Sequence, residues 1–172
     1  MNDIRERTLA EVNPARIEHP VLADIHAYWN AKRGTRTMPT RAEISPLELR
    51  DQLGWIILVD VLTGFSDFRY RLIGTKVAHY FGADATGKTI TEAFEPFGAD
   101  AVRSVQSVHR QAAELKLPVR AHGDAAWLAD GFDTFDSIFL PLSEDGETAN
   151  MILSAFTFDY GVVKAKSKSM LL

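Results

Sequence analysis

The sequence contains no cysteine among its 172 residues. This absence excludes disulfides, zinc sites with cysteine ligands, thiol nucleophiles and thiol adducts to a chromophore. No apolar run approaches the roughly 20 residues of a membrane-spanning helix, and the N-terminus MNDIRERTLAEVN lacks the apolar stretch of a secretory signal. We therefore expect a soluble, cytoplasmic protein with no membrane partner.

The sequence also lacks a basic stripe or a Lys/Arg block outside the short tail KAKSKS, and the formal net charge is -4. A protein without a basic stripe has no electrostatic footprint for nucleic acid, so no nucleic-acid partner is expected. Hydrophobic residues make up 46% and charged residues 24% of the chain, which is typical of one globular domain with a core.

Two helix signals occur in the first third of the chain. Pro20 and Gly34 bracket a helix whose apolar side carries Leu22, Ile25 and Trp29. Further on, Ser45 and Glu48 have the spacing of a capping box, which predicts a second helix that ends at Gly54.

The spacing of apolar residues then changes from the pattern of a helix to that of a β-strand. The segments 55–62 and 68–74 read as two adjacent strands, with Phe68, Tyr70 and Leu72 alternating against arginines. Short helical pieces cover 75–97, the longest helical pattern covers 98–117, and three strands are expected at 119–128, 135–142 and 148–158. Asp145-Gly146 predicts a hairpin between the last two strands.

Residues 82–89 read GADATGKT, which matches the phosphate-binding pattern G-x-x-x-x-G-K-[ST]. A nucleotide-binding enzyme using this loop and Asp60 is therefore an alternative, with Gly82, Gly87, Lys88 and Thr89 as its site residues. A phosphate loop lies between a parallel strand and a long helix, whereas here helical spacing precedes the loop and Pro96 cuts the following helix short. The context argues against the enzyme, and we expect Lys88 to be an exposed charge.

The order of two strands, short helices, one long helix and three strands resembles a PAS domain. FRYRLIGTKVAHYFGADATGKTITEAF resembles the PAS segment that follows the second strand, and AYW, KRGTRTMPTR and ISPLELRDQLG resemble the start of stand-alone bacterial PAS proteins. The resemblance implies an α+β fold with a five-stranded antiparallel sheet and helices over one face. It divides the chain into an N-terminal helical extension (1–54) packed on the domain, a PAS domain (55–160) and a C-terminal tail (161–172).

The resemblance implies a non-enzymatic sensor or protein-interaction module in bacterial signalling, with a possible small molecule in its cavity. The side chains expected to line that cavity are Tyr70, Leu72, Val105, His109, Trp127 and Phe139. We find no catalytic or metal motif and expect no tightly bound cofactor, although haem-binding PAS proteins place their iron ligand on the helix that carries His109.

Partner binding is the second expectation. No output segment is visible in the sequence, so the signal is expected to pass to another signalling protein. The apolar side of the first helix, with Leu22, Ile25 and Trp29, could form a homodimer or could cover the protein's own sheet.

Overall fold

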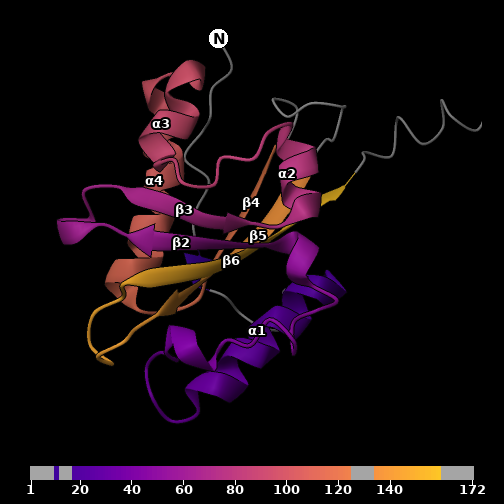
Figure 1. Ribbon diagram of the computed structural model, residues 1–172, viewed down its shortest axis with the longest axis vertical. Coiled ribbons are helices and arrows are strands. Elements are labelled where there is room, and N and C mark those ends of the chain that lie inside the picture. The colour runs from indigo at the N-terminus through magenta and orange to yellow at the C-terminus, as the bar shows by residue number, and fades with distance from the viewer. Residues whose placement is uncertain (1–9, 12–16, 125–133, 160–172) are drawn as a thin grey trace, which may run out of the picture.

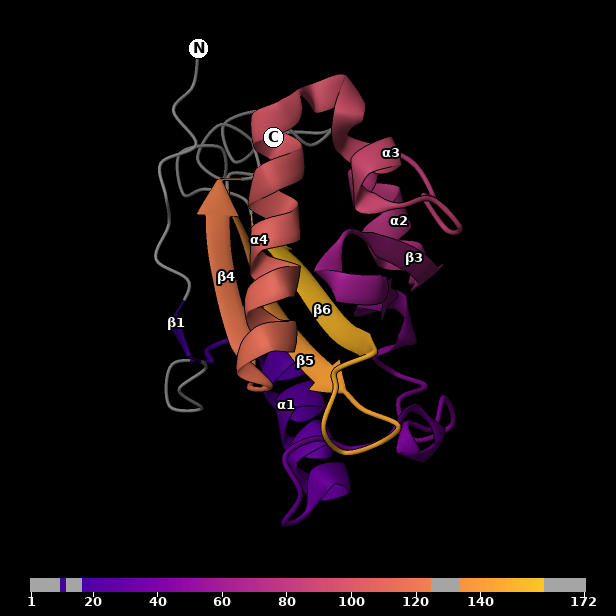
Figure 2. The same cartoon turned by 90° about the vertical axis from the view of Figure 1, so that its left-hand side faces the viewer.

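The computed structural model describes residues 10–11, 17–124 and 134–159. Within these residues a six-stranded antiparallel sheet has the order β1-β4-β5-β6-β2-β3, with α4 across one face and α1 on the other (Figures 1 and 2). The strands are β1 (Ala10–Glu11), β2 (Ile56–Val61), β3 (Phe68–Ile73), β4 (Val119–Asp124), β5 (Thr134–Leu142) and β6 (Met151–Asp159). The helices are α1 (Pro20–Arg33), α2 (Thr75–Phe81), α3 (Ile90–Phe94) and α4 (Ala99–Leu115).

The predicted α+β fold is confirmed, and β2 to β6 form its five-stranded sheet. The two-residue β1, which the sequence analysis did not foresee, pairs with the outer edge of β4. The hairpin predicted at Asp145-Gly146 joins β5 to β6. No helix in the described part of the chain is long and apolar enough to cross a lipid bilayer.

Helix α1 begins and ends where the sequence predicts. The side chain of His19 accepts the Val21 amide at its start, and Gly34 at its end has a φ of 56°, which favours glycine. Leu22, Ile25 and Trp29 are buried, and the indole Nε1 of Trp29 donates to the carbonyl of Pro141 on β5 at 2.9 Å.

Of the two roles predicted for the apolar side of α1, the structure supports the second, because α1 covers the chain's own sheet. The side chains proposed for a homodimer are therefore not exposed. A dimer through them would first require α1 to leave β5 and β6.

The second predicted helix is wrong. Residues 46–52 form a series of turns, followed by a 3₁₀ turn at Leu53–Trp55. The Glu48 carboxylate does not close a capping box, because it accepts the Tyr28 hydroxyl at 2.8 Å and pairs with Lys32 at 2.7 Å. Contacts with α1, about 20 residues away in sequence, thus override the local capping signal.

A β-bulge in β3 changes the face on which its last residues lie. Val59 pairs with Tyr70 but Leu58 pairs with Leu72, so Arg71 is the additional residue. Beyond the bulge Ile73 is buried and Leu72 is 39% exposed. The expectation that Leu72 lines an internal cavity is therefore wrong.

Candidate functional site between helix α4 and the sheet

The inner face of the sheet is the face covered by α4. Phe139 on β5 pairs with Ser154 on β6, and Ser154 pairs with Ile57 on β2. Directly opposed residues in antiparallel strands lie on the same face. The ring of Phe139 contacts the imidazole of His109 on α4, so this row of side chains faces the helix.

His109 is the ionisable group at the centre of this layer. It is 2% exposed, and its ring lies 4.9 Å from the ring of Phe139 and 5.3 Å from that of Phe68, centre to centre. Burial lowers its pKa to about 4, although the hydrogen bond to Val105 and the charge of Asp67 both favour the protonated form. The imidazole is therefore neutral at pH 7.

The hydrogen bond of His109 fixes its tautomer. Nδ1 lies 2.7 Å from the carbonyl oxygen of Val105, and a carbonyl can only accept, so Nδ1 carries the proton. In the neutral ring Nε2 is then an acceptor with a free lone pair. Within the described residues Nε2 has no hydrogen-bond partner.

Ser154 supplies a second polar atom without a partner in the same layer. Its side chain is completely buried, and its Oγ makes no hydrogen bond within the described residues. Buried polar groups are nearly always satisfied, and an unsatisfied one in a folded protein calls for an explanation such as a bound water or ligand. Phe139 contacts His109 and is paired with Ser154, so both polar atoms belong to the layer between α4 and the sheet.

Tyr70 and Val105 complete the part of the predicted cavity that the structure brings together. Tyr70 is buried on the same face of β3 as Phe68, and burial raises the pKa of its hydroxyl well above the usual range, as the nearby carboxylate of Asp67 does further. The hydroxyl therefore stays protonated. Val105 is partly buried and supplies the carbonyl that orients His109.

One of the six predicted residues does not contribute here. Leu72 lies beyond the bulge and is exposed, as described above. Trp127 lies outside the described residues. Ser154 and Phe68 were not among the predicted site residues. The signal for Ser154 was a serine within the apolar run MILSAFTF. It lies two residues from both Ile152 and Phe156, so the alternation of a strand places all three on one face.

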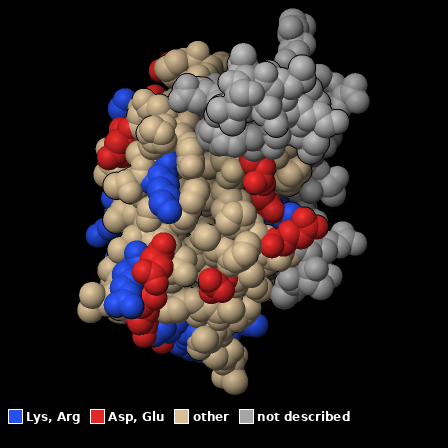
Figure 3. All heavy atoms as spheres, turned by 90° about the vertical axis from the view of Figure 1, so that its right-hand side faces the viewer, with Lys and Arg blue, Asp and Glu red and all other residues tan. Residues whose placement is uncertain are grey.

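An aromatic cluster extends from this layer toward α2 and was not predicted as a group. The Tyr80 ring stacks on Trp55 at 5.8 Å and lies 4.8 Å from Phe158, and the Lys76 ammonium lies 4.5 Å from the centre of the Trp55 ring. The Phe156 ring continues the row to Phe139 at 5.7 Å. On the side of the molecule that carries α2, charged side chains surround a broad uncharged area (Figure 3).

The GADATGKT loop lacks the surroundings of a phosphate loop. The seven-residue helix α2 precedes it, and the five-residue helix α3 follows it. A phosphate loop needs a strand before it and a long helix after it. Asp60, which the nucleotide-enzyme alternative uses together with this loop, instead pairs with Arg71 at 3.3 Å near the surface.

The backbone amides of this loop are already bonded within the protein. The Gly87 amide donates to the Tyr70 carbonyl at 2.7 Å, and the Lys88 amide donates to the Ala85 carbonyl at 3.0 Å. Two further amides donate to carboxylates, Thr86 to Asp84 at 2.8 Å and Thr89 to Glu92 at 2.7 Å. The loop thus borders the edge of β3 and presents two carboxylates, which would repel a phosphate. The nucleotide-enzyme alternative has no support.

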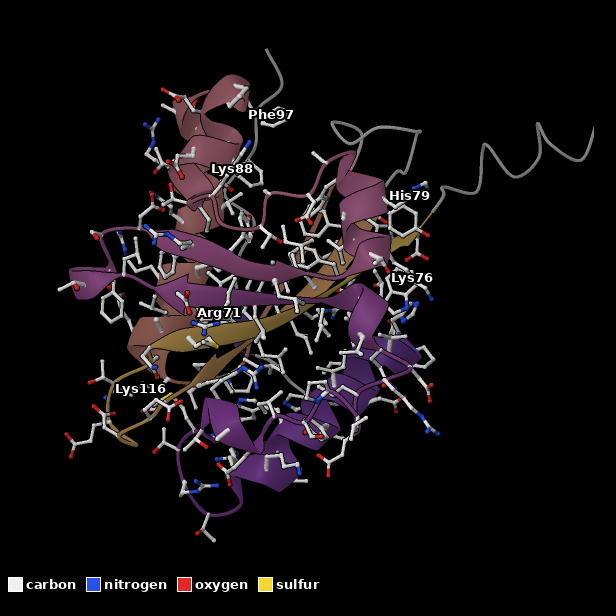
Figure 4. The ribbon with its side chains drawn as sticks, in the orientation of Figure 1. Arg71, Lys76, His79, Lys88, Phe97 and Lys116 are labelled. Atoms are coloured by element: carbon white, nitrogen blue, oxygen red, sulfur yellow. The ribbon has the colours of Figure 1, made fainter. Side chains whose placement is uncertain are left out.

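We expect Lys88→Ala to leave the free energy of unfolding within about 0.5 kcal/mol of the wild-type value, because the side chain is exposed. Lys88 lies at the loop near α3 (Figure 4). Titration with a fluorescent ATP analogue should show no binding to either form. Micromolar binding that is lost in Lys88→Ala would contradict this prediction.

The other histidines do not form a metal centre. Within the described ranges no three His, Asp or Glu side chains are arranged to hold a metal ion. His19 and His122 line a hollow of about 240 Å³ on the opposite face of the sheet. Two of its charged residues, Arg120 and Asp136, bond to each other through two hydrogen bonds, at 2.8 and 2.5 Å.

Comparison with solved structures finds chains that are similar to this one. The PAS domain from Bordetella pertussis BvgS is 15% identical, with a TM-score of 0.53 over 72% of this chain and 90% of that chain. A sensory box sensor histidine kinase from Vibrio cholerae is 19% identical, with a TM-score of 0.45 over 65% of this chain and 87% of that chain. No curated protein matches the sequence. The family model of the PAS domain matches residues 17–157, and the chain therefore belongs to the PAS domain family.

Proposed function

We propose that this PAS domain is a non-enzymatic sensor that binds a small molecule between α4 and the sheet. One observation supports this proposal above the others: the buried Ser154 Oγ has no hydrogen-bond partner in the described residues, and it lies in the same layer as the Nε2 acceptor of His109. PAS domains are typically sensor modules in signalling, which makes ligand binding a natural use for these atoms.

The chemistry of the two atoms defines the class of ligand. Nε2 of the neutral imidazole accepts a hydrogen bond, and the serine hydroxyl can either donate or accept. Their surroundings are aromatic and aliphatic, so the ligand has an apolar ring or chain and one hydroxyl or amine group. The His109 ring contacts the rings of both Phe68 and Phe139, and this close packing favours a ligand of a few atoms over a macrocycle.

The proposed output is a change in association with another signalling protein. The row of rings from Phe139 through Phe156 to the α2 cluster provides packed contacts between the site and the surface. Close-packed side chains transmit small displacements because an aromatic interior cannot deform continuously. A ligand bound next to His109 would thus shift the position of α2 or α4.

Phenol and benzene form a matched pair of probes for this site. We expect phenol to bind the wild-type chain about three- to tenfold more tightly than benzene, because its hydroxyl can donate to Nε2 of His109. In His109→Phe the difference between the two probes should disappear. Ligand-dependent shifts of amide signals in NMR titrations measure both affinities, and thermal unfolding with each probe checks them independently.

Native mass spectrometry of the freshly purified protein provides a complementary test, with an uncoloured small-molecule adduct as the expected result. His79→Phe is the control variant, because His79 is exposed on α2. The proposal would be wrong if neither probe bound, since the layer would then be a filled core. It would also be wrong if His109→Phe still preferred phenol.

A further inference from the structure

A surface hollow at the end of the sheet opposite α2 has features of a protein-docking site. It has a volume of about 320 Å³ and is lined by residues of three separate segments. These segments are the C-terminal end of α4, the β2–β3 turn and the β5–β6 turn, which meet on the side that faces the viewer in Figure 2. The lining residues are Phe65, Ala113, Glu114, Lys116, Thr148 and Ala149, together with Glu147.

The floor of this hollow is apolar and its rim is charged. Ala113 and Ala149 are buried beneath it, and Phe65 is partly buried at its side. At the same end of α4, Leu115 is 50% and Leu117 37% exposed. Exposed leucines beside an apolar hollow are typical of a surface that another protein covers.

Two of the residues that line the hollow have a backbone conformation that is unfavourable for any residue other than glycine. Phe65 and Lys116, with φ of 55° and 57°, are the non-glycine residues of positive φ in the part of the chain that is described. Each costs free energy relative to glycine, and such residues concentrate at functional sites. The Arg110 guanidinium holds the Phe65 carbonyl at 3.0 Å, so the turn is fixed in this shape.

The third wall is rigid and acidic. The Asp145 carboxylate accepts the Ser143 hydroxyl and the amides of Glu147 and Thr148, at 2.8, 2.8 and 2.7 Å. These bonds, those from the Thr148 and Glu147 amides first, lower the pKa of Asp145 to about 2 and keep it charged. Glu144 and Glu147 are exposed on the same turn.

The charges around the hollow identify the kind of partner. Glu114 and Glu147 line it together with one lysine, Lys116, which Figure 4 shows near the β5–β6 turn. Glu144 and Asp145 add two carboxylates on that same turn. The nearby Arg110 is engaged with Phe65. An anionic lipid surface or a nucleic acid would be repelled by this rim. A second copy that presented the same face would bring like charges together.

We propose that the hollow docks a basic amphipathic segment of a partner protein, with an apolar side chain on the floor and Lys or Arg against the rim. The volume lies at the lower end of the range of about 300 to 1,000 Å³ for binding pockets, which suits one or two apolar side chains. This surface is separate from the site at His109, so its test does not depend on the proposed ligand.

The probe is the peptide Ac-KKLLKKLLKKLL-NH2, and its matched control is Ac-EELLEELLEELL-NH2. We expect the basic peptide to bind the full chain and to shift the amide signals of residues 113–117 and 147–149. Glu147→Lys should weaken binding at least tenfold, and so should Leu115→Ser. Glu95→Lys, an equal charge reversal at an exposed position beside α3, should change the affinity less than twofold.

Several outcomes would overturn the proposal. Equal binding of the acidic peptide would show that only apolar contact matters, and an equal loss in Glu95→Lys would show that only net charge matters. Amide shifts elsewhere on the chain would place the site elsewhere. Concentration-dependent association in sedimentation velocity that is lost in Leu115→Ser would make a second copy of this chain the occupant.

Discussion

Acidification from pH 6.5 to 4 is expected to lower the free energy of unfolding by about 3 kcal/mol through His109 alone. In the unfolded chain this imidazole takes up a proton near its ordinary pKa of 6.5, whereas burial holds the pKa in the folded protein at about 4. Between these values the unfolded state binds more protons than the folded state. The stabilisation is therefore complete above pH 6.5 and is lost as the pH falls toward 4.

His109→Phe isolates this contribution, because phenylalanine keeps a ring between Phe68 and Phe139 and has no proton to bind. Urea unfolding at several pH values should show a steeper loss of stability for the wild type than for the variant. His26 is also buried, and burial lowers its pKa in the same direction, so some acid sensitivity between pH 6.5 and 4 remains in the variant. Identical pH profiles of the two proteins would contradict the placement of His109 in the core.

The elements of the domain were predictable where one local pattern dominates. The 3.6-residue period of 98–117 placed Val105 and His109 on the side of a helix that the structure packs against the sheet. Asp145-Gly146 determined a turn without help from distant residues. The order of these elements, together with the resemblance of residues 68–94 to a PAS segment, predicted the PAS fold.

Other features depend on contacts that local sequence does not encode. Alternation in FRYRLI predicts an inward Leu72, but one bulged residue opposite β2 reverses the alternation after Arg71. The capping signal at Ser45 fails because Tyr28 and Lys32 on α1 bind the Glu48 carboxylate. The tautomer of His109 follows from a 2.7 Å hydrogen bond and could not be predicted from composition or period.

The hollow at the end of α4 could not be predicted from local sequence either. Its walls come from residues near 65, 115 and 148, which no pattern in the sequence connects. Leu115 is spaced like the apolar residues of α4, yet it is the last residue of that helix and is 50% exposed. A residue that looks like core in the sequence thus becomes part of an exposed surface.

Trp29→Ala is expected to lower the free energy of unfolding by about 3 to 5 kcal/mol, the usual cost of removing a buried aromatic side chain. Trp29 is buried between α1 and the sheet, and its indole N–H donates to the Pro141 carbonyl at 2.9 Å. The substitution leaves a cavity and removes the donor from a buried carbonyl. Chemical denaturation with both circular dichroism and tryptophan fluorescence measures the change.

Two further variants separate the causes of this loss. Trp29→Phe keeps a ring but removes the N–H, so it should cost less than Trp29→Ala. Phe97→Ala, at an aromatic residue that is 60% exposed, should stay within about 0.5 kcal/mol of the wild type. If Trp29→Ala cost no more than Phe97→Ala, α1 would not be packed on β5 and β6 in solution. Leu22, Ile25 and Trp29 would then be free to bind a second protein, and the self-covering role of α1 would be wrong.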